Sequence, residues 1–437
     1  MADIPRRAAQ RTAKLASLPF GMAGRVAAGW GRRLTGQDAD EVSADVSART
    51  AEQLFAVLGQ LKGGAMKFGQ ALSVFEAAVP DELAGPYREA LTRLQAAAPP
   101  MQTASVHRML AEQLGSGWRD RFAEFDETPA AAASIGQVHR ATWHDGREVA
   151  VKVQYPGADE ALRSDLRQLT RFSRLFQSLA PGAEVKPLLA ELQDRMVEEL
   201  DYRSEADYQR AFAAAFRGDV DVRVPEVVAS SPKVMVTEWV TGTPFAQLIT
   251  DGDHELRNEA GRLLAEFHYS SPARVGLLHA DPHPGNFLLL DDGRISVLDF
   301  GAAARLPDGP PRTLGRMLRL AVDDRADELL QLLRDEHFVQ PGHEVDAADV
   351  QAYLGPFVDP ARTPTFHFTR EWLQHQAERV GDLRSPDFRT ARSLNLPPEY
   401  LLIHRVTLGA TGILCQLDAE VAAQDIIRRW QPGFAED

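Results

Sequence analysis

The sequence lacks the features that define several large classes of protein. It has a single cysteine, Cys415, within an apolar run, so we expect no internal disulfide, a reducing compartment and a buried thiol. No window approaches about 20 uninterrupted apolar residues, the length of a transmembrane helix, and the nearest candidate, residues 15–30, is interrupted by Pro19 and Arg25. The formal net charge of −14 leaves no basic excess to meet phosphates, so we expect no nucleic-acid partner.

What the sequence does contain describes a folded protein with more than one core. Its 437 residues are 44% hydrophobic and 25% charged, which predicts two or three globular lobes. The first 36 residues carry seven Lys or Arg and one acid, Asp3. This segment fits an amphipathic surface helix, a transit peptide or a solvated basic tail. We therefore expect a cytoplasmic protein, either free or bound peripherally to the inner face of the membrane.

One stretch, residues 277–301, organises the rest of the chain. It reads LLHADPHPGNFLLLDDGRISVLDFG, with an expected hairpin between His279-Ala-Asp281 and Asp299-Phe-Gly. Phosphoryl transfer needs a carboxylate near the attacking oxygen and oxygen ligands for Mg²⁺, and kinases supply them from an H-x-D-x4-N loop and a D-F-G strand end. Asp281 is the candidate catalytic carboxylate, and Asn286 and Asp299 are the candidate metal ligands. A zinc site at His279 and His283 lacks a third ligand nearby.

A second stretch occupies the place of the loop that covers ATP phosphates in kinases. Residues 129–139 read PAAAASIGQVH, so alanines stand where kinases have most of their glycines, and the strands 138–143 and 148–153 follow. Alanine narrows the accessible backbone, so we expect a different grip on phosphate. Lys152, in the run VAVKV, fits the lysine that pairs with the α- and β-phosphates.

A kinase also needs a helical glutamate to hold that lysine. The helical pattern at 186–216 offers Glu198, Glu199 and Glu205, and spacing alone does not choose among them. Two strands follow, at 224–229 and 234–240. Residues 237–242, which include Glu238 and Val240, are expected to form the hinge that meets adenine.

The remaining segments indicate what surrounds this centre. Lys67 and Gln70 share a face of an expected helix between residues 40 and 98, and by physics alone a packing helix is the better interpretation. Helices are expected at 105–114, 255–269, 313–333, 369–380, 398–417 and 420–430, with a loop-rich insert at 341–364. The glycine-containing helix has no Walker A motif. No A-P-E segment follows the D-F-G residues, and this absence argues against a protein substrate.

Four of these segments together resemble the ABC1/AarF/UbiB family of atypical kinases, which includes the Coq8-type proteins. They are KFGQ at 67–70, the alanine-rich stretch at 131–137, ELD at 199–201 with Glu205, and the residues from His279 to Asn286 with Asp299. The resemblance implies that Glu205 is the partner of Lys152. It also implies a regulatory lid in which Glu199 and Asp201 face Lys67 and Gln70, and this replaces the packing interpretation of Lys67.

These observations lead to one architecture and a set of candidate roles. We expect an α+β, bilobal protein-kinase-like fold with an N-terminal helical KxGQ extension over the active-site cleft, divided as 1–40 (basic segment), 41–118 (extension), 119–240 (N-lobe) and 241–437 (helical C-lobe). The cofactors are ATP and Mg²⁺, and the partner is a lipid or quinone-like molecule. The expected activity is that of an atypical kinase or ATPase; the alternatives are an ATP-binding scaffold and a small-molecule phosphotransferase. The candidate ATP-binding residues are Ala131, Ala132, Ala133, Ser134, Ile135, Gly136, Gln137, Val138, Lys152, Glu238 and Val240.

Overall fold

The computed structural model describes residues 100–133, 135–158, 200–340, 342–381 and 384–435. These residues fall into two compact units. The first contains the described residues up to Arg203 together with Ala229–Val236, and the second contains Ser204–Val228 and Thr237–Asp437. The lid residues Lys67, Gln70 and Glu199, and Ser134 of the alanine-rich stretch, lie outside the described residues.

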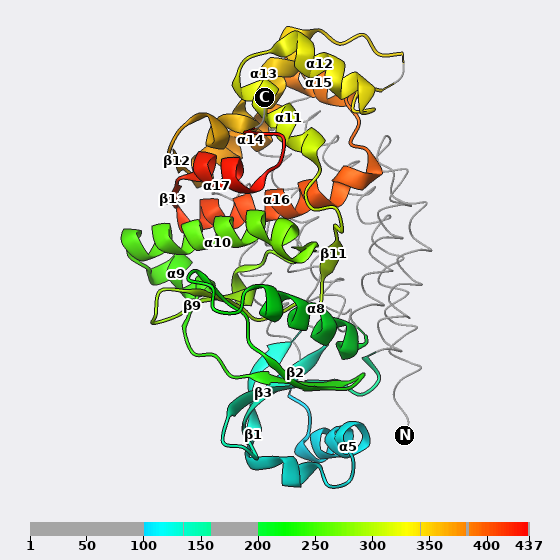
Figure 1. The fold of residues 1–437 in the computed structure, drawn as a ribbon, viewed down its shortest axis with the longest axis vertical. Helices are drawn as coiled ribbons and strands as arrows, with labels where there is room; N and C mark the ends of the chain where they lie inside the picture. The colour runs from blue at the N-terminus through cyan, green and yellow to red at the C-terminus, as the bar shows by residue number, and fades with distance from the viewer. Residues whose placement is uncertain (1–99, 134, 159–199, 341, 382–383, 436–437) are drawn as a thin grey trace, which may run out of the picture. The chain divides into compact units, whose positions relative to one another are not determined.

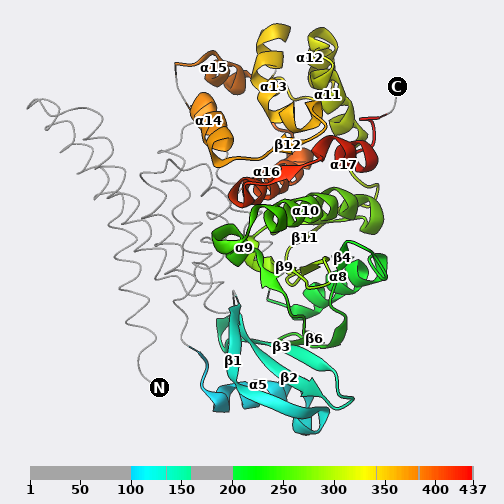
Figure 2. The ribbon, with the colours of Figure 1, turned by 90° about the vertical axis from the view of Figure 1, so that its left-hand side faces the viewer.

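The first unit is built on a five-stranded sheet with helix α5 (Thr103–Leu114) beside it (Figure 2). Its strand order is β1-β2-β3-β6-β5, where β5 and β6 run across the division between the units. The strands are β1 (Phe122–Ala133), β2 (Gly136–Trp143), β3 (Glu148–Gln154), β5 (Val227–Ser230) and β6 (Val234–Glu238). A short 3-10 helix, η2 (Trp118–Arg121), precedes β1.

Alternation along β3 explains which side of this sheet is buried. Val149, Val151 and Val153 are 0% exposed, whereas Lys152 lies on the opposite face, because successive side chains of a strand point to opposite sides. At the far end of the β1–β2 hairpin, the rings of Phe122 and Trp143 meet edge to face with centroids 5.0 Å apart.

The second unit contains short strands and most of the helices (Figure 1). A four-stranded sheet has the order β4-β10-β9-β7, with β10 and β4 parallel and the other pairs antiparallel. Two-stranded ribbons are formed by β8 with β11 and by β12 with β13. The strands are β4 (Val222–Arg223), β7 (Thr243–Pro244), β8 (Leu277–His279), β9 (Phe287–Leu289), β10 (Ile295–Val297), β11 (Ala303–Arg305), β12 (Phe366–His367) and β13 (Glu420–Val421).

The long helix α10 lies beside α16 at the centre of this unit, and the two contact each other (Figure 1). Asp253 caps α10 by accepting a hydrogen bond from Leu256 N, and Gly276 ends it in the left-handed conformation. The helices are α8 (Tyr202–Ala215), α9 (Phe245–Asp251), α10 (His254–Val275), η3 (Pro284–Asn286), α11 (Arg312–Val322), α12 (Ala326–Asp335), α13 (Ala347–Arg362), α14 (Arg370–Gly381), α15 (Pro386–Ser393), α16 (Pro398–Leu417) and α17 (Ala423–Trp430).

Most expected elements are confirmed, but two expectations between residues 313 and 364 are wrong. The expected helix at 313–333 is two helices, because Asp324 adopts a φ of 55° and Arg362 donates hydrogen bonds to its carboxylate and to Ala321 O. The expected loop-rich insert contains α13, which Asp346 caps by accepting a hydrogen bond from Ala348 N. The last helix also begins later than expected, at Ala423, because β13 precedes it.

One described helix, α16, is long and apolar enough to cross a membrane by length and composition alone. In this structure 56% of the apolar 18-residue stretch within α16 is buried inside the protein. The side of α16 that packs on the unit's core includes Ile413, Leu414 and Leu417. The core helix of a globular domain passes the same test, so the finding is weak evidence for a span.

Candidate active site

The H-x-D-x4-N loop and the D-F-G residues are held together by backbone hydrogen bonds within the second unit. Ala280 N donates to Ala302 O at 2.9 Å, and Leu298 N donates to Asn286 O at 2.9 Å. The β9–β10 hairpin lies between the two motifs, as expected from the sequence. Local pairing of consecutive segments thus brings Asp281, Asn286 and Asp299 onto one hairpin framework.

His279 fixes the backbone at Asp299 rather than offering a metal ligand. The side chain is 4% exposed, and its Nε2 donates to Asp299 O at 2.7 Å. The ring is enclosed by three phenylalanines, Phe267, Phe287 and Phe300, with centroids 5.5–5.8 Å away. The nearby His283 accepts a hydrogen bond from Gly285 N through Nδ1. Both imidazoles therefore have structural tasks in this loop.

Asp281 and Asn286 contact each other directly. Asn286 Nδ2 lies 3.2 Å from Asp281 Oδ2 and 3.1 Å from Asp281 O, so the amide donates to the carboxylate and to its backbone. Asn286 is 7% exposed. Because both hydrogen bonds use Nδ2, the oxygen Oδ1 is the atom that Asn286 offers to a metal ion.

Asp299 lies half-buried two residues after β10, and its Oδ1 accepts a hydrogen bond from Gly301 N at 2.8 Å. The next side chain, Phe300, is fully buried and packs on Phe212 of α8 at 4.9 Å between ring centroids. Asn286 and Asp299 offer an amide oxygen and a carboxylate oxygen, the kind of ligand that Mg²⁺ prefers. This part of the chain therefore fits a magnesium ion.

In the first unit, the alanine-rich stretch is a hairpin rather than an extended loop. Ala131, Ala132 and Ala133 belong to β1 and pair with Val138, Gln137 and Gly136 of β2. Only positions 134 and 135 lie between the two strands. Ile135 is 4% exposed, and its carbonyl accepts a hydrogen bond from Tyr155 N. Ala131 and Ala132 are exposed and present their methyl groups to solvent.

Gly136 is the one glycine of this hairpin, and packing explains why. A Cβ at this position would lie 2.3 Å from Val153 O and 2.8 Å from Tyr202 Oη, both far inside contact distance. Gln137 is also committed to the interior of this unit. Its Oε1 accepts from Met101 N at 2.8 Å, and its Nε2 lies 2.7 Å from His139 Nε2. Burial lowers the pKa of His139, whose Nδ1 lies 2.8 Å from Asp126 O.

Lys152 stands on β3 opposite Val138, and its Nζ lies 5.0 Å from the centre of the Tyr202 ring. This cation–π geometry holds the ammonium over an aromatic face. Glu205, in the first turn of α8, is 5% exposed and belongs to the second unit. The pairing of Lys152 with Glu205 stays a prediction.

The other predicted positions have local partners. Asp201 accepts hydrogen bonds from the backbone and the guanidinium of Arg203, which lower the pKa of its carboxyl. Glu238 accepts from Glu226 N and lies 3.8 Å from Arg223, and Val240 follows in an irregular segment. The expected lid contact of Asp201 involves residues outside the described part of the chain.

Among the described residues, sequence reasoning missed the aromatic support of the catalytic loop. Phe212, Phe267 and Phe287 surround His279 and Phe300 from three different elements. The signal available in the sequence was the apolar periodicity of residues 202–216 and 254–275. A surface hollow of about 630 Å³ beside Gly276, Pro307 and Trp430 contains none of the predicted site residues.

Comparisons with known proteins identify the family of the chain. The model of the ABC1 atypical kinase-like domain matches residues 93–333. The mitochondrial atypical kinase COQ8B of Danio rerio is 31% identical over 87% of this chain and 61% of its own length. COQ8B of Rattus norvegicus is 30% identical over 86% of this chain and 71% of its length. This chain therefore spans under two thirds of the fish protein.

A solved structure extends the likeness to three dimensions. It is the structure of Rv3197 from Mycobacterium tuberculosis in complex with erythromycin. That protein is 49% identical to this chain, and the two structures superpose with a TM-score of 0.71 over 92% of this chain and all of the other. A sheet-rich lobe and a helical lobe with a kinase-like domain are thus confirmed. The family model covers more than half of the chain, and on that ground the chain belongs to the ABC1 atypical kinase-like family.

Proposed function

We propose that the chain is a Mg²⁺-dependent ATP-binding atypical kinase or ATPase that acts on, or is regulated by, a lipid or quinone-like molecule. The observation that carries the proposal is the contact between Asp281 and Asn286 on the hairpin that ends at Asp299. All three polar positions of a phosphoryl-transfer site are filled, in a family whose curated relatives are named atypical kinases. The bound nucleotide with its metal would supply the transferable phosphoryl group and neutralise its charge.

Each residue has a task in this proposal that follows from its surroundings. Asn286 holds the Asp281 carboxylate through Nδ2, so that Asp281 can orient or deprotonate the attacking hydroxyl or water. Asp299 and Asn286 Oδ1 hold the metal. His279 keeps the Asp299 backbone in place from inside its aromatic enclosure. Lys152 binds phosphate oxygens, and Glu205 holds Lys152.

The alanine-rich hairpin and the lid both favour slow turnover and a restricted choice of phosphate acceptor. The backbone of the alanine-rich hairpin is largely engaged in strand pairing, so it offers fewer amides to phosphate than a flexible glycine loop. The lid formed by Lys67, Gln70, Glu199 and Asp201 would restrict access to ATP and a small or lipidic molecule. A relation to isoprenoid-quinone metabolism and peripheral membrane contact through residues 1–40 belong to this proposal.

The first test is ATP hydrolysis by the purified full chain with Mg²⁺, with and without anionic liposomes and a quinol-like phenol. Asp299→Asn should remove turnover, because an amide replaces a charged metal ligand. Asp291→Asn, at the exposed turn of the same hairpin, is the matched control and should retain it. ATP binding without turnover under every condition would favour a non-catalytic ATP-binding scaffold instead.

A second candidate function is binding or phosphorylation of a macrolide. It is favoured by the 49% identity to a protein whose structure contains erythromycin. Calorimetry with erythromycin, followed by mass spectrometry of the drug after incubation with Mg²⁺ and ATP, separates the outcomes. A mass increase of one phosphoryl group (net HPO₃) would identify a small-molecule phosphotransferase, whereas binding without modification would identify a macrolide-binding protein.

A further inference from the structure

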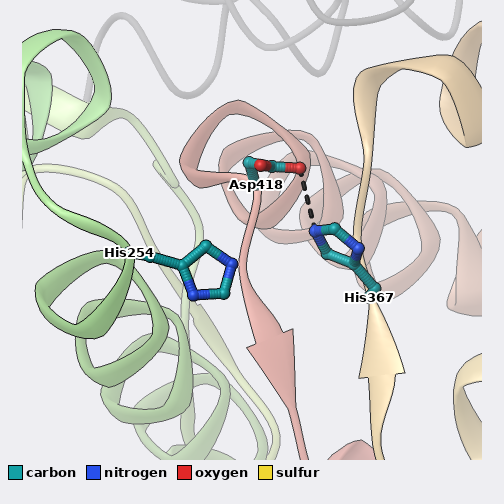
Figure 3. Close-up of side chains that lie close together, drawn as sticks. All are labelled: His254, His367 and Asp418. Atoms are coloured by element: carbon teal, nitrogen blue, oxygen red, sulfur yellow. Dashed lines mark ion pairs between the residues drawn. The ribbon is translucent and has the colours of Figure 1, made fainter.

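Two histidines and an aspartate converge on the second unit, on elements that the proposed phosphoryl-transfer site does not use (Figure 3). His254 is the first residue of α10, His367 lies on β12, and Asp418 follows the last residue of α16. The ring of His254 points toward the other two side chains, which are joined by an ion pair (Figure 3). Three segments that are well separated in the sequence thus meet at one point.

The donor atoms lie close to the separations that a tetrahedral metal ion needs. One ligand atom from each residue lies within 4.8 Å of the other two, and His367 Nε2 is 2.9 Å from Asp418 Oδ1. Zinc binds imidazole nitrogen and carboxylate oxygen at about 2.0–2.2 Å, which places neighbouring tetrahedral ligands about 3.3–3.5 Å apart. Small side-chain movements therefore bring all three donors into bonding distance.

The backbone around these side chains is already ordered by hydrogen bonds. His367 pairs with Glu420 across the β12–β13 ribbon, and Phe368 N donates to Ala419 O at 2.9 Å. Asp418 adopts a left-handed conformation with φ 54°, which turns the chain from α16 into β13. Little conformational freedom of the main chain remains to be lost when a ligand binds here.

Asn258 links His254 to the β12–β13 ribbon. Its Oδ1 accepts a hydrogen bond from Glu420 N at 2.8 Å, and its Nδ2 lies 3.2 Å from His254 Nδ1. The first turn of α10 is therefore tied to β13 beside Asp418. A metal ion bound at Nδ1 of His254 would replace its contact with Asn258.

We propose that His254, His367 and Asp418 form a zinc-binding site that clamps the start of α10 to the β12–β13 ribbon. Two imidazoles and one carboxylate are a zinc ligand set, whereas Mg²⁺ and Ca²⁺ prefer oxygen ligands alone. The His367 and Asp418 side chains are 42% and 44% exposed, so an ion can enter from solvent and keep a water molecule as fourth ligand. An exposed ion pair without the metal would contribute little to stability.

The test is isothermal calorimetry of the untagged full chain with ZnCl₂, in millimolar Mg²⁺ to occupy the oxygen-ligand site. We expect one zinc ion per chain. His367→Ala should weaken binding by about 100-fold or more, since even loss of a residue that supports a zinc ligand costs 10–100-fold. Asp418→Asn should also weaken it, while the left-handed backbone is kept because asparagine tolerates that conformation. His343→Ala, an exposed histidine outside the cluster, should bind zinc like the parent chain.

Two further readouts separate a bound metal from misfolding. The unfolding temperature of each variant without zinc should match that of the parent chain, and saturating zinc should raise the parent value by about 5–10 °C but not that of His367→Ala. Co²⁺ in place of zinc should give the visible bands of a four-coordinate ion. Absence of one-to-one binding, or equal affinity in the parent, His367→Ala and Asp418→Asn chains, would overturn the proposal.

Discussion

His268 gives the sharpest pH-dependent prediction for the second unit. It lies on α10, and its Nε2 is 3.2 Å from Thr407 Oγ1 of α16, where the two central helices pack. Burial lowers the pKa of His268 from 6.5 to about 4, and the neighbouring His279 acts in the same direction. The site therefore accepts the neutral imidazole and disfavours the charged one.

The sign and size of the effect follow from proton linkage. Because the folded-state pKa is below the unfolded value, the unfolded chain binds more protons, and the free energy of unfolding falls as the pH drops below about 6.5. The folded and unfolded pKa values of His268 differ by about 2.5. This difference lowers the free energy of unfolding by about 3 kcal/mol once the pH is below both pKa values, and by about 2 kcal/mol at about pH 5. For a unit of this size, 2 kcal/mol is a change of about 4–8 °C in Tm.

The assay compares Tm between about pH 8 and pH 5 for the parent chain and His268→Gln, which keeps a polar partner for Thr407. Glutamine does not titrate, so the variant should lose about 4–8 °C less than the parent over this range. His343→Gln, an exposed control, should follow the parent. Parallel curves for the parent chain and His268→Gln would refute the argument that His268 is held neutral by burial.

Two further predictions concern packing and a buried hydrogen bond. Gly136→Ala should lower the free energy of unfolding by about 1–3 kcal/mol and weaken ATP binding, because its Cβ would lie 2.3 Å from Val153 O. In Gly117→Ala the new Cβ would lie 3.4 Å from the nearest atom, which is an ordinary contact. Gly136→Ala should therefore unfold at a clearly lower urea concentration than Gly117→Ala. Glu266→Ala should cost about 1–3 kcal/mol, because Trp430 Nε1 donates to Glu266 at 2.6 Å and would lose its partner. Equal urea midpoints for Glu266→Ala and its parent would contradict that role.

The sequence predicted those features that depend on local pairing. The β9–β10 hairpin was predictable because an Asp-Asp-Gly turn separates two apolar runs of matching length. The β2–β3 hairpin was predictable for the same reason, and with it the position of Lys152 opposite Val138. The hydrogen bond between Asn286 and Asp281 also follows from residues five apart in one loop.

The errors came from interactions that join distant segments. Nothing near Asp324 in the sequence indicates that Arg362, 38 residues away, will hold it and divide α11 from α12. The prolines at 356 and 360 favoured a loop, yet α13 forms around them because Val350 and Val358 are buried against α11 and α12. In both places tertiary packing overrides local propensity.

The aromatic enclosure of His279 shows why a sequence motif does not reveal everything that determines the geometry of the H-x-D-x4-N loop. The polar residues of H-x-D and D-F-G are recognisable by type and spacing, but their geometry depends on apolar contacts that carry no motif. His279 can donate to Asp299 O because Phe267 of α10 and Phe287 of β9 fix its ring, and Phe300 is placed by Phe212 of α8. The helix that carries the predicted glutamate, Glu205, also carries Phe212. A shift of α8 would therefore reach Asp299 through the tilted and edge-to-face ring contacts of Phe212, Phe300 and His279 within the second unit. These contacts give this fold a physical means to couple the position of that helix to Asp299, the residue proposed as a metal ligand.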